Sequence, residues 1–75
     1  MKLITLSSPI AVRNNYETRL VNVVEGATHR IGGSGDLMIR IHRYFNSATQ
    51  SMEAVAGGTQ VTVKASNIRS EQEVA

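Results

Sequence analysis

The sequence predicts an α+β fold, a small antiparallel sheet of five to six short strands with one short helix at about residues 47–56. Short segments rich in β-branched residues, separated by turn signals, fill the first two thirds of the chain and predict the strands. Residues 46–58 then show signals for both ends of a helix. The alternative is an all-β small barrel, in which a hairpin over 52–64 replaces the helix.

The predicted strands lie between turn signals along the chain. Pro9, Asn14-Asn15 and Glu25-Gly26 separate the segments before the glycine-rich loop, because proline removes a ladder donor and asparagine and glycine tolerate a positive φ. The segments predicted as strands are 2–7, 10–13, 16–24, 27–31, 37–45 and 59–66. Their spacing predicts a meander of about four strands in the middle of the chain.

Two interpretations of residues 46–58 stay open. In the helical one, Ser47 and Gln50 form a capping box and Gly57 ends the helix. In the hairpin one, Gly57-Gly58 is a two-residue turn between two strands. Two independent helix-end signals and an alanine-rich interior favour the helix.

The length of 75 residues predicts one small domain. We expect residues 1–68 to form the globular part, and 69–75 to form a polar tail that is either a frayed helix or disordered. A chain this short buries only about 60% of the surface of its unfolded form, so a single copy is marginally stable. The chain has no cysteine, which excludes disulfides and thiolate metal sites. We therefore expect a homo-oligomer.

The chain is mildly basic, with a net charge of +2, and six of its eight basic residues are arginines. Arginine pairs with phosphate and carboxylate through a planar fork, so the composition permits an anionic ligand without requiring one. The apolar run at the N-terminus is shorter than the h-region of a signal peptide, and no segment reaches the ~20 apolar residues of a membrane span. We expect a cytoplasmic protein with no membrane partner.

The loop Gly32-Gly33-Ser34-Gly35 is a candidate phosphate-binding loop whose context argues against that role. A P-loop needs a lysine after its last glycine and opens a helix. Here no lysine follows, and the next segment alternates as a strand does. We interpret the loop as a hairpin connection whose glycines allow positive φ, with an anion-binding backbone nest left open.

The strands on either side of this loop predict a basic sheet face. A loop that closes Ile31 against Leu37 sets Arg30 beside Met38, and successive side chains then alternate between the two faces. The ligand-binding residues predicted on one face are Arg19, Arg30, Arg40, His42 and Tyr44. The apolar residues among them, which predict an interface, are Val21, Val23 and Met38. A register shift of one residue would send all of these side chains to the opposite face.

Neither histidine predicts a metal or catalytic site. In this register His29 falls on the apolar face, and His42 lies among arginines, which repel a cation. No spacing of serine, histidine and carboxylate resembles a catalytic arrangement. We expect no catalytic residue, no metal and no cofactor.

Two classes of function follow from the basic face. The first is a small non-enzymatic binding protein that recognises an anionic ligand, a nucleotide or a nucleic acid. The alternative is a protein–protein interaction module or an inhibitor of a host or partner protein, whose valine, methionine and arginine side chains dock that partner. The size and composition are typical of accessory proteins of phages or mobile elements.

Overall fold

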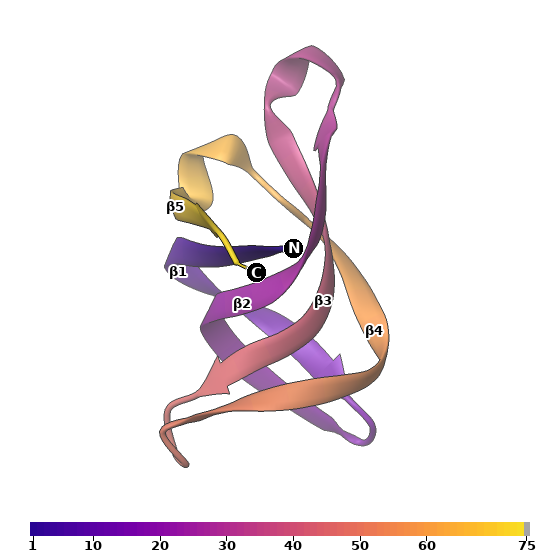
Figure 1. Cartoon of the computed structure of the whole chain (residues 1–75), viewed down its shortest axis with the longest axis vertical. Coiled ribbons are helices and arrows are strands. Elements are labelled where there is room, and N and C mark those ends of the chain that lie inside the picture. The colour runs from indigo at the N-terminus through magenta and orange to yellow at the C-terminus, as the bar shows by residue number, and fades with distance from the viewer. Residues whose placement is uncertain (75) are drawn as a thin grey trace.

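The polypeptide forms a curled half-barrel of five antiparallel strands (Figure 1). The computed structural model describes residues 1–74. The strands are β1 (Lys2–Asn14), β2 (Glu17–Ile31), β3 (Asp36–Asn46), β4 (Ser51–Val63) and β5 (Ile68–Glu73). They lie in one sheet in the order β4-β3-β2-β1-β5, so β4 and β5 are its edges. The helical segments of this part of the chain are two 3₁₀ turns, η1 (Gly32–Ser34) and η2 (Ala65–Asn67), and the predicted α+β class is therefore wrong.

The helix predicted at residues 47–56 is replaced by a turn and the start of β4. The Gln50 Nε2 atom donates to the Ser47 carbonyl oxygen (2.8 Å), and Asn46 Oδ1 accepts from the Ala48 amide (2.9 Å). Gln50 also has a φ of 57°, in the left-handed region that stops a helix. The polar groups that would cap a helix thus close a tight turn, and pairing with β3 overrides a weak helical preference.

The alternative prediction of an all-β fold agrees with the observed class. The hairpin that it places over 52–64 is wrong, because β4 continues through that region without reversing direction. Gly57 and Gly58 both have a φ of 74° and bend the strand. The bend lies where the register with β3 is irregular, between Ile41 and Arg43. The two glycines therefore curl the sheet and do not connect two strands.

Two further turn signals also lie inside strands, so the fold has five strands that are mostly longer than predicted. Pro9 lies in an irregular stretch of β1, where the register with β2 shifts between Thr5 and Ile10. Gly26 lies within β2 and pairs with Lys2 on one side and with Ile41 on the other. Both residues mark local distortions of a continuous strand.

Two predicted hairpin connections are confirmed. A tight turn in which Asn15 has a φ of 59° joins β1 to β2. The glycine loop joins β2 to β3, with φ values of 47° at Gly32 and 76° at Gly35. Asparagine and glycine adopt this conformation at the least steric cost, which is why the sequence predicts these two turns well.

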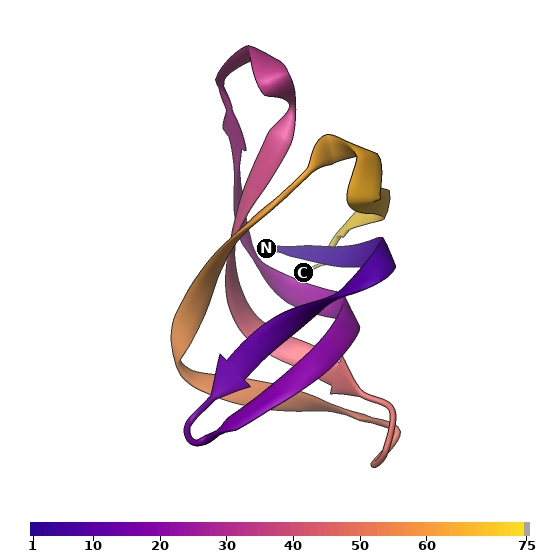
Figure 2. The ribbon, with the colours of Figure 1, turned by 180° about the vertical axis from the view of Figure 1, so that it is seen from behind.

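Most of the segment predicted as a polar tail, 69–75, belongs to the sheet as β5. It pairs with β1 from Ile68, opposite Leu6, to Glu73, opposite Lys2. The start of β1 and the end of β5 consequently lie side by side in both views (Figures 1 and 2). A polar and charged sequence suits an exposed edge strand as well as it suits a tail. Ala75 lies outside the described residues.

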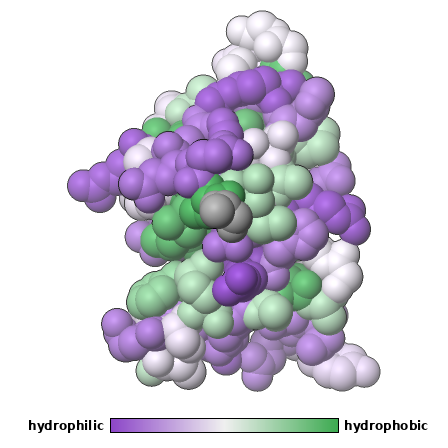
Figure 3. Space-filling view, in the orientation of Figure 1, coloured by the Kyte–Doolittle hydropathy of each residue, from purple (hydrophilic) through white to green (hydrophobic). Residues whose placement is uncertain are grey.

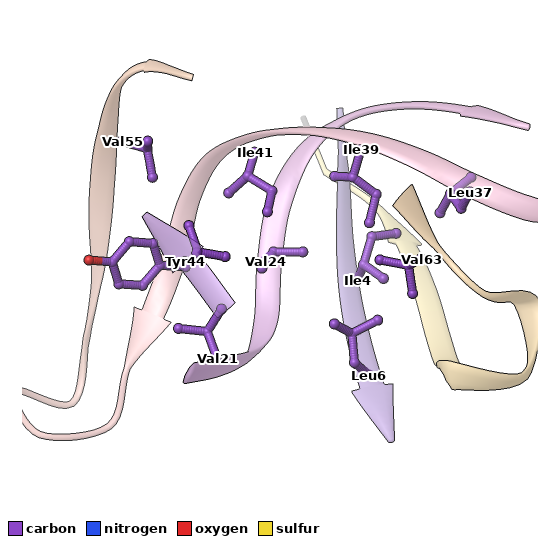
Figure 4. Packing of buried hydrophobic residues seen from close by; sticks show 11 residues of the cluster. Ile4, Leu6, Val21, Val24, Leu37, Ile39, Ile41, Tyr44, Val55 and Val63 are labelled. Carbon is purple, nitrogen blue, oxygen red and sulfur yellow. The ribbon is translucent and has the colours of Figure 1, made fainter. Parts of the chain in front are cut away.

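One hydrophobic core fills the concave side of the curled sheet (Figure 4). Its buried members come from four strands and are Ile4, Leu6, Val12, Val21, Val24, Leu37, Ile39, Ile41, Tyr44, Val55 and Val63. Tyr44 is the largest fully buried side chain. The core therefore depends on aliphatic residues packed around one aromatic ring.

The half-barrel is closed at one end by side-chain hydrogen bonds between β1 and β4. Asn14 Nδ2 donates to the Ala54 carbonyl oxygen and Thr59 Oγ1 donates to the Arg13 carbonyl oxygen, both over 3.3 Å. No backbone ladder joins β1 to β4 in the part of the chain that the structure describes. The end of β4 and the first half of β1 diverge in Figure 2, and we call the boundary between them the seam.

Candidate anion-binding cavity

The predicted basic face does not form, because β2 and β3 pair one residue away from the predicted register. Arg30 pairs with Leu37, and His29 pairs with Met38. Directly paired residues share a face, so Arg30 lies on the concave side with Leu37. Arg40 lies on the convex side, as does His29, which was predicted on the apolar face. The two arginines consequently lie on opposite faces.

Arg30 belongs to an ion-pair cluster that joins two elements of the fold. Its Nη2 donates to the Glu71 carboxylate, and its Nη1 donates to the Gly35 carbonyl oxygen (2.9 Å). Lys2 Nζ lies 3.3 Å from the other carboxylate oxygen of Glu71. The guanidinium of Arg30 thus links the glycine loop to β5, and these contacts account for its position without a ligand.

Tyr44 lies in the core because an irregularity at His42 shifts the alternation of β3. Ile41 and Tyr44 both point inward, although they are three residues apart in a strand. The Tyr44 hydroxyl accepts from Asn14 Nδ2 (3.3 Å) and donates to Glu53 Oε2 (3.0 Å). Tyr44 is therefore a core residue with a polar tip, and its ring is not free to stack on a ligand.

Glu53 is the centre of a polar network at the closed end of the half-barrel. Asn46 Nδ2 donates to Glu53 Oε1 (2.6 Å). Arg19, predicted to bind a ligand, lies on the same side and donates through Nη2 to Glu17 Oε2 (2.9 Å). The hydrogen bonds from Asn46 and Tyr44, together with the charge of Arg19, lower the pKa of Glu53 from its ordinary 4.5 in spite of desolvation.

A second carboxylate, Glu71, has a lowered pKa for a similar reason. Burial raises the pKa of this carboxyl group, but the hydrogen bonds and charges of Arg30 and Lys2 more than offset that effect. A carboxyl group whose folded pKa lies below its unfolded value contributes stability above the unfolded pKa and loses it as the pH falls through the folded pKa. Glu53 and Glu71 should therefore stabilise the fold at neutral pH and not in acid.

This linkage predicts that the free energy of unfolding falls between about pH 6 and about pH 3. The double variant Glu53→Gln, Glu71→Gln should be less stable at the higher pH and should lose less stability on acidification, because the two titrating groups are gone. Urea unfolding followed by circular dichroism at several pH values measures how steeply the free energy of unfolding of each protein changes with pH. An equally steep pH dependence in the variant would contradict the assignment.

The remaining predicted residues are divided between the core and the convex surface. Val21 is in the core, Val23 is half-buried, and His42 is partly buried at the irregularity of β3. Met38 and Arg40 face outward at a shallow depression of about 150 Å³. This depression is lined by Ala27, Thr28, His29, Met38, Arg40 and Gln60. In Figure 3 the hydrophobic surface gathers in the middle of the molecule, and hydrophilic residues cover most of the region above it.

The glycine loop is a turn whose polar groups bond within the protein. Ser34 Oγ donates to the Ile31 carbonyl oxygen (3.0 Å) and accepts from the Asp36 amide (3.3 Å). Asp36 Oδ1 accepts from the Ala65 amide (3.2 Å), so the base of the loop is joined to η2. The loop thereby helps to place η2 beside the seam.

A cavity of about 410 Å³ that is widely open to solvent lies in the seam, away from the predicted face. It is lined by Ser7, Ser8, Ile10, Thr62, Val63, Lys64, Ser66 and Asn67. These residues come from β1, from the end of β4 and from η2. Its volume is within the roughly 300–1,000 Å³ of ligand pockets. None of the lining residues was predicted as a site residue.

Asn67 holds the walls of this cavity together. Its Oδ1 accepts from the Ser8 amide (2.7 Å), and its Nδ2 donates to the Ser8 carbonyl oxygen (3.1 Å). The Asn67 amide in turn donates to the Lys64 carbonyl oxygen (2.9 Å). The two sequence signals for the cavity are SSP at 7–9 and KASN at 64–67, and no local pattern connects segments so far apart.

The lining of the cavity favours an anionic group. Lys64, three serines and one threonine line it, and these residue types supply hydrogen-bond donors, while no carboxylate residue lines it. Lys64 is exposed and has no ion pair within residues 1–74. Val63, which is buried, and Ile10 supply an apolar wall. A cation would find one ammonium group and no carboxylate here, whereas a phosphate or carboxylate would find several donors.

Among residues 1–74, no three histidine, aspartate or glutamate side chains come close enough together to hold a metal ion. The same residues include no helix with the length and apolar character needed to cross a membrane. No protein-family model matches the chain, and comparison with curated proteins and with solved structures gives no match. The function is therefore inferred from the cavity itself.

Proposed function

We propose that this chain is a non-enzymatic binding protein whose seam cavity holds an anionic group, a phosphate or a carboxylate. The observation that supports this proposal is the set of donors around the cavity, with Lys64 the one charged lining residue. The apolar wall of Ile10 and Val63 can pack against the carbon atoms of a ligand that carries the anionic group. The homo-oligomer and the cytoplasmic location expected from the sequence stay predictions.

A small anionic group fits these observations better than a nucleic-acid backbone does. Nucleic acids are bound by several basic side chains that contact successive phosphates along one surface. Arg30 and Arg40 lie on opposite faces, and Arg30 is already bonded to Glu71. The seam offers one cation and several hydroxyl groups, which suits a single charged group.

Titration with inorganic phosphate and with acetate, followed by ¹⁵N–¹H correlation spectra, tests the proposal. We expect saturable shifts of the amides of Ser7, Ser8, Lys64 and Ser66. Lys64→Gln should weaken binding about tenfold, because a hydrogen bond to a charged group contributes about 1.5–3 kcal/mol and part of that is screened at an exposed site.

The matched control is Arg69→Gln, which removes the same charge from an exposed position of β5 that does not line the cavity. This variant should bind phosphate and acetate as the unmodified protein does. An equal loss of affinity in both variants would show a non-specific charge effect and overturn the proposal. Shifts confined to the glycine loop or to Arg40 would place the anion elsewhere and overturn it too.

A further inference from the structure

Most of the exposed edge of the sheet is protected against pairing with a strand from another polypeptide. The edge strand β5 is short and includes Arg69, Glu71 and Glu73, and charged side chains discourage the addition of another strand. On the other side of the seam, Pro9 has no amide hydrogen, and the backbone groups of Ser8 are bonded to the side chain of Asn67. Neither segment is available as a template for pairing.

The end of β4 lacks these protections. Residues 60–63 have the sequence QVTV, with no charge and no proline, and valine and threonine favour strands. They pair with β3 on one side only. Alternate residues of an edge strand direct their N–H and C=O groups away from the paired neighbour. Unpaired backbone donors and acceptors therefore line the seam next to the cavity that Lys64 borders.

We propose that an extended acidic peptide segment of a partner protein adds to β4 along residues 60–63 and places a carboxylate beside Lys64. The inference rests on the proposed function and names the source of the anionic group. Backbone hydrogen bonds would provide the affinity, and the charge of Lys64 would select an acidic segment. The apolar wall of Ile10 and Val63 offers space for an aliphatic side chain of the same segment.

A second copy of the chain fits the seam less well than an acidic peptide does. Antiparallel pairing of two β4 strands would bring one carboxylate per copy, that of Glu53. This carboxylate is already bonded to Asn46 and Tyr44 at the closed end of the half-barrel. Charge complementarity at Lys64 therefore favours a different, acidic polypeptide.

The test uses a short synthetic peptide of alternating threonine and valine that ends in two aspartates. One matched peptide ends in two asparagines, and another has N-methylated backbone amides that cannot donate. We expect the acidic peptide to slow amide hydrogen exchange within residues 60–63. The asparagine peptide and the Lys64→Gln variant should each show affinity lowered by about tenfold, whereas Arg69→Gln should not.

Each other outcome has a defined meaning. If the N-methylated peptide binds as well as its parent, strand addition is overturned and the anion site stands. If phosphate binds in a Lys64-dependent manner and the acidic peptide does not, the inference fails and the proposed function stands. If protection of residues 60–63 appears without peptide and rises with protein concentration, the occupant is a second copy and the inference is overturned. If neither phosphate nor peptide binds, both proposals fail.

Discussion

Gly26→Ala should lower the free energy of unfolding by at least about 3 kcal/mol, a large part of the roughly 4–11 kcal/mol expected for a chain of this length. A Cβ atom on Gly26 would overlap the carbonyl oxygen of Arg40 and lie 2.8 Å from its carbonyl carbon. Both atoms belong to the backbone of β3, so no side chain can rotate away to relieve the overlap. The β2–β3 ladder would have to separate near the middle of the sheet.

Gly33→Ala is the matched control for this prediction. A Cβ atom at Gly33 has no other atom within 4 Å, and its φ lies outside the left-handed region. Alanine there should change the stability by less than about 1 kcal/mol. Urea unfolding of both variants, followed by circular dichroism, gives the comparison. Equal effects at the two glycines would contradict the close approach of β2 to β3.

Tyr44→Ala should destabilise the protein by about 3–5 kcal/mol, the usual cost of removing a fully buried aromatic ring. Tyr44 is 0% exposed and is the largest side chain of a core that is otherwise aliphatic. Tyr16→Ala provides the control, because Tyr16 is 98% exposed. That substitution should stay within about 0.5 kcal/mol. A loss of stability in Tyr44→Ala as small as that in Tyr16→Ala would mean that the Tyr44 ring is exposed and that β3 keeps its regular alternation past His42.

Tyr44→Phe separates the contribution of the ring from that of the hydroxyl group. The ring stays in place, while Asn14 loses an acceptor and Glu53 loses a donor. We expect a loss of about 1–2 kcal/mol and a rise in the pKa of Glu53, since the Tyr44 hydroxyl is one of the groups that lower it. The titration of the Glu53 side chain in ¹³C spectra measures this rise. A destabilisation as large as that of Tyr44→Ala would assign the whole effect to the hydroxyl group.

Turn signals were reliable where the backbone itself requires a special conformation. Asn15, Gly32 and Gly35 all have positive φ, and the sequence predicts hairpin connections at these places. Gly26 and Pro9 are also of turn-forming residue types, but they lie inside strands. Gly26 is needed there because another strand approaches closely, and this reason becomes visible only when β3 is in place.

Most of the candidate site could not be predicted from the sequence. The predicted basic face depended on one assumed register, and a shift of one residue placed Arg30 and Arg40 on opposite sides. Arg30 then meets Glu71, which is 41 residues further along the chain. The observed cavity depends on the bonds between Ser8 and Asn67, which are separated by 59 residues. No composition or spacing within either segment indicates such a partner.

The sequence alone determined the local β preference, two of the hairpin turns, the absence of disulfides and a basic composition rich in arginine. Only the tertiary structure decided which side chains share a face, that residues 51–63 form a strand and that 68–73 complete the sheet. The physical reason is that alternation along a strand defines two faces but not which one is buried. That choice is made by hydrogen-bond ladders between strands, by irregularities such as those at Pro9 and His42, and by the packing of one shared core.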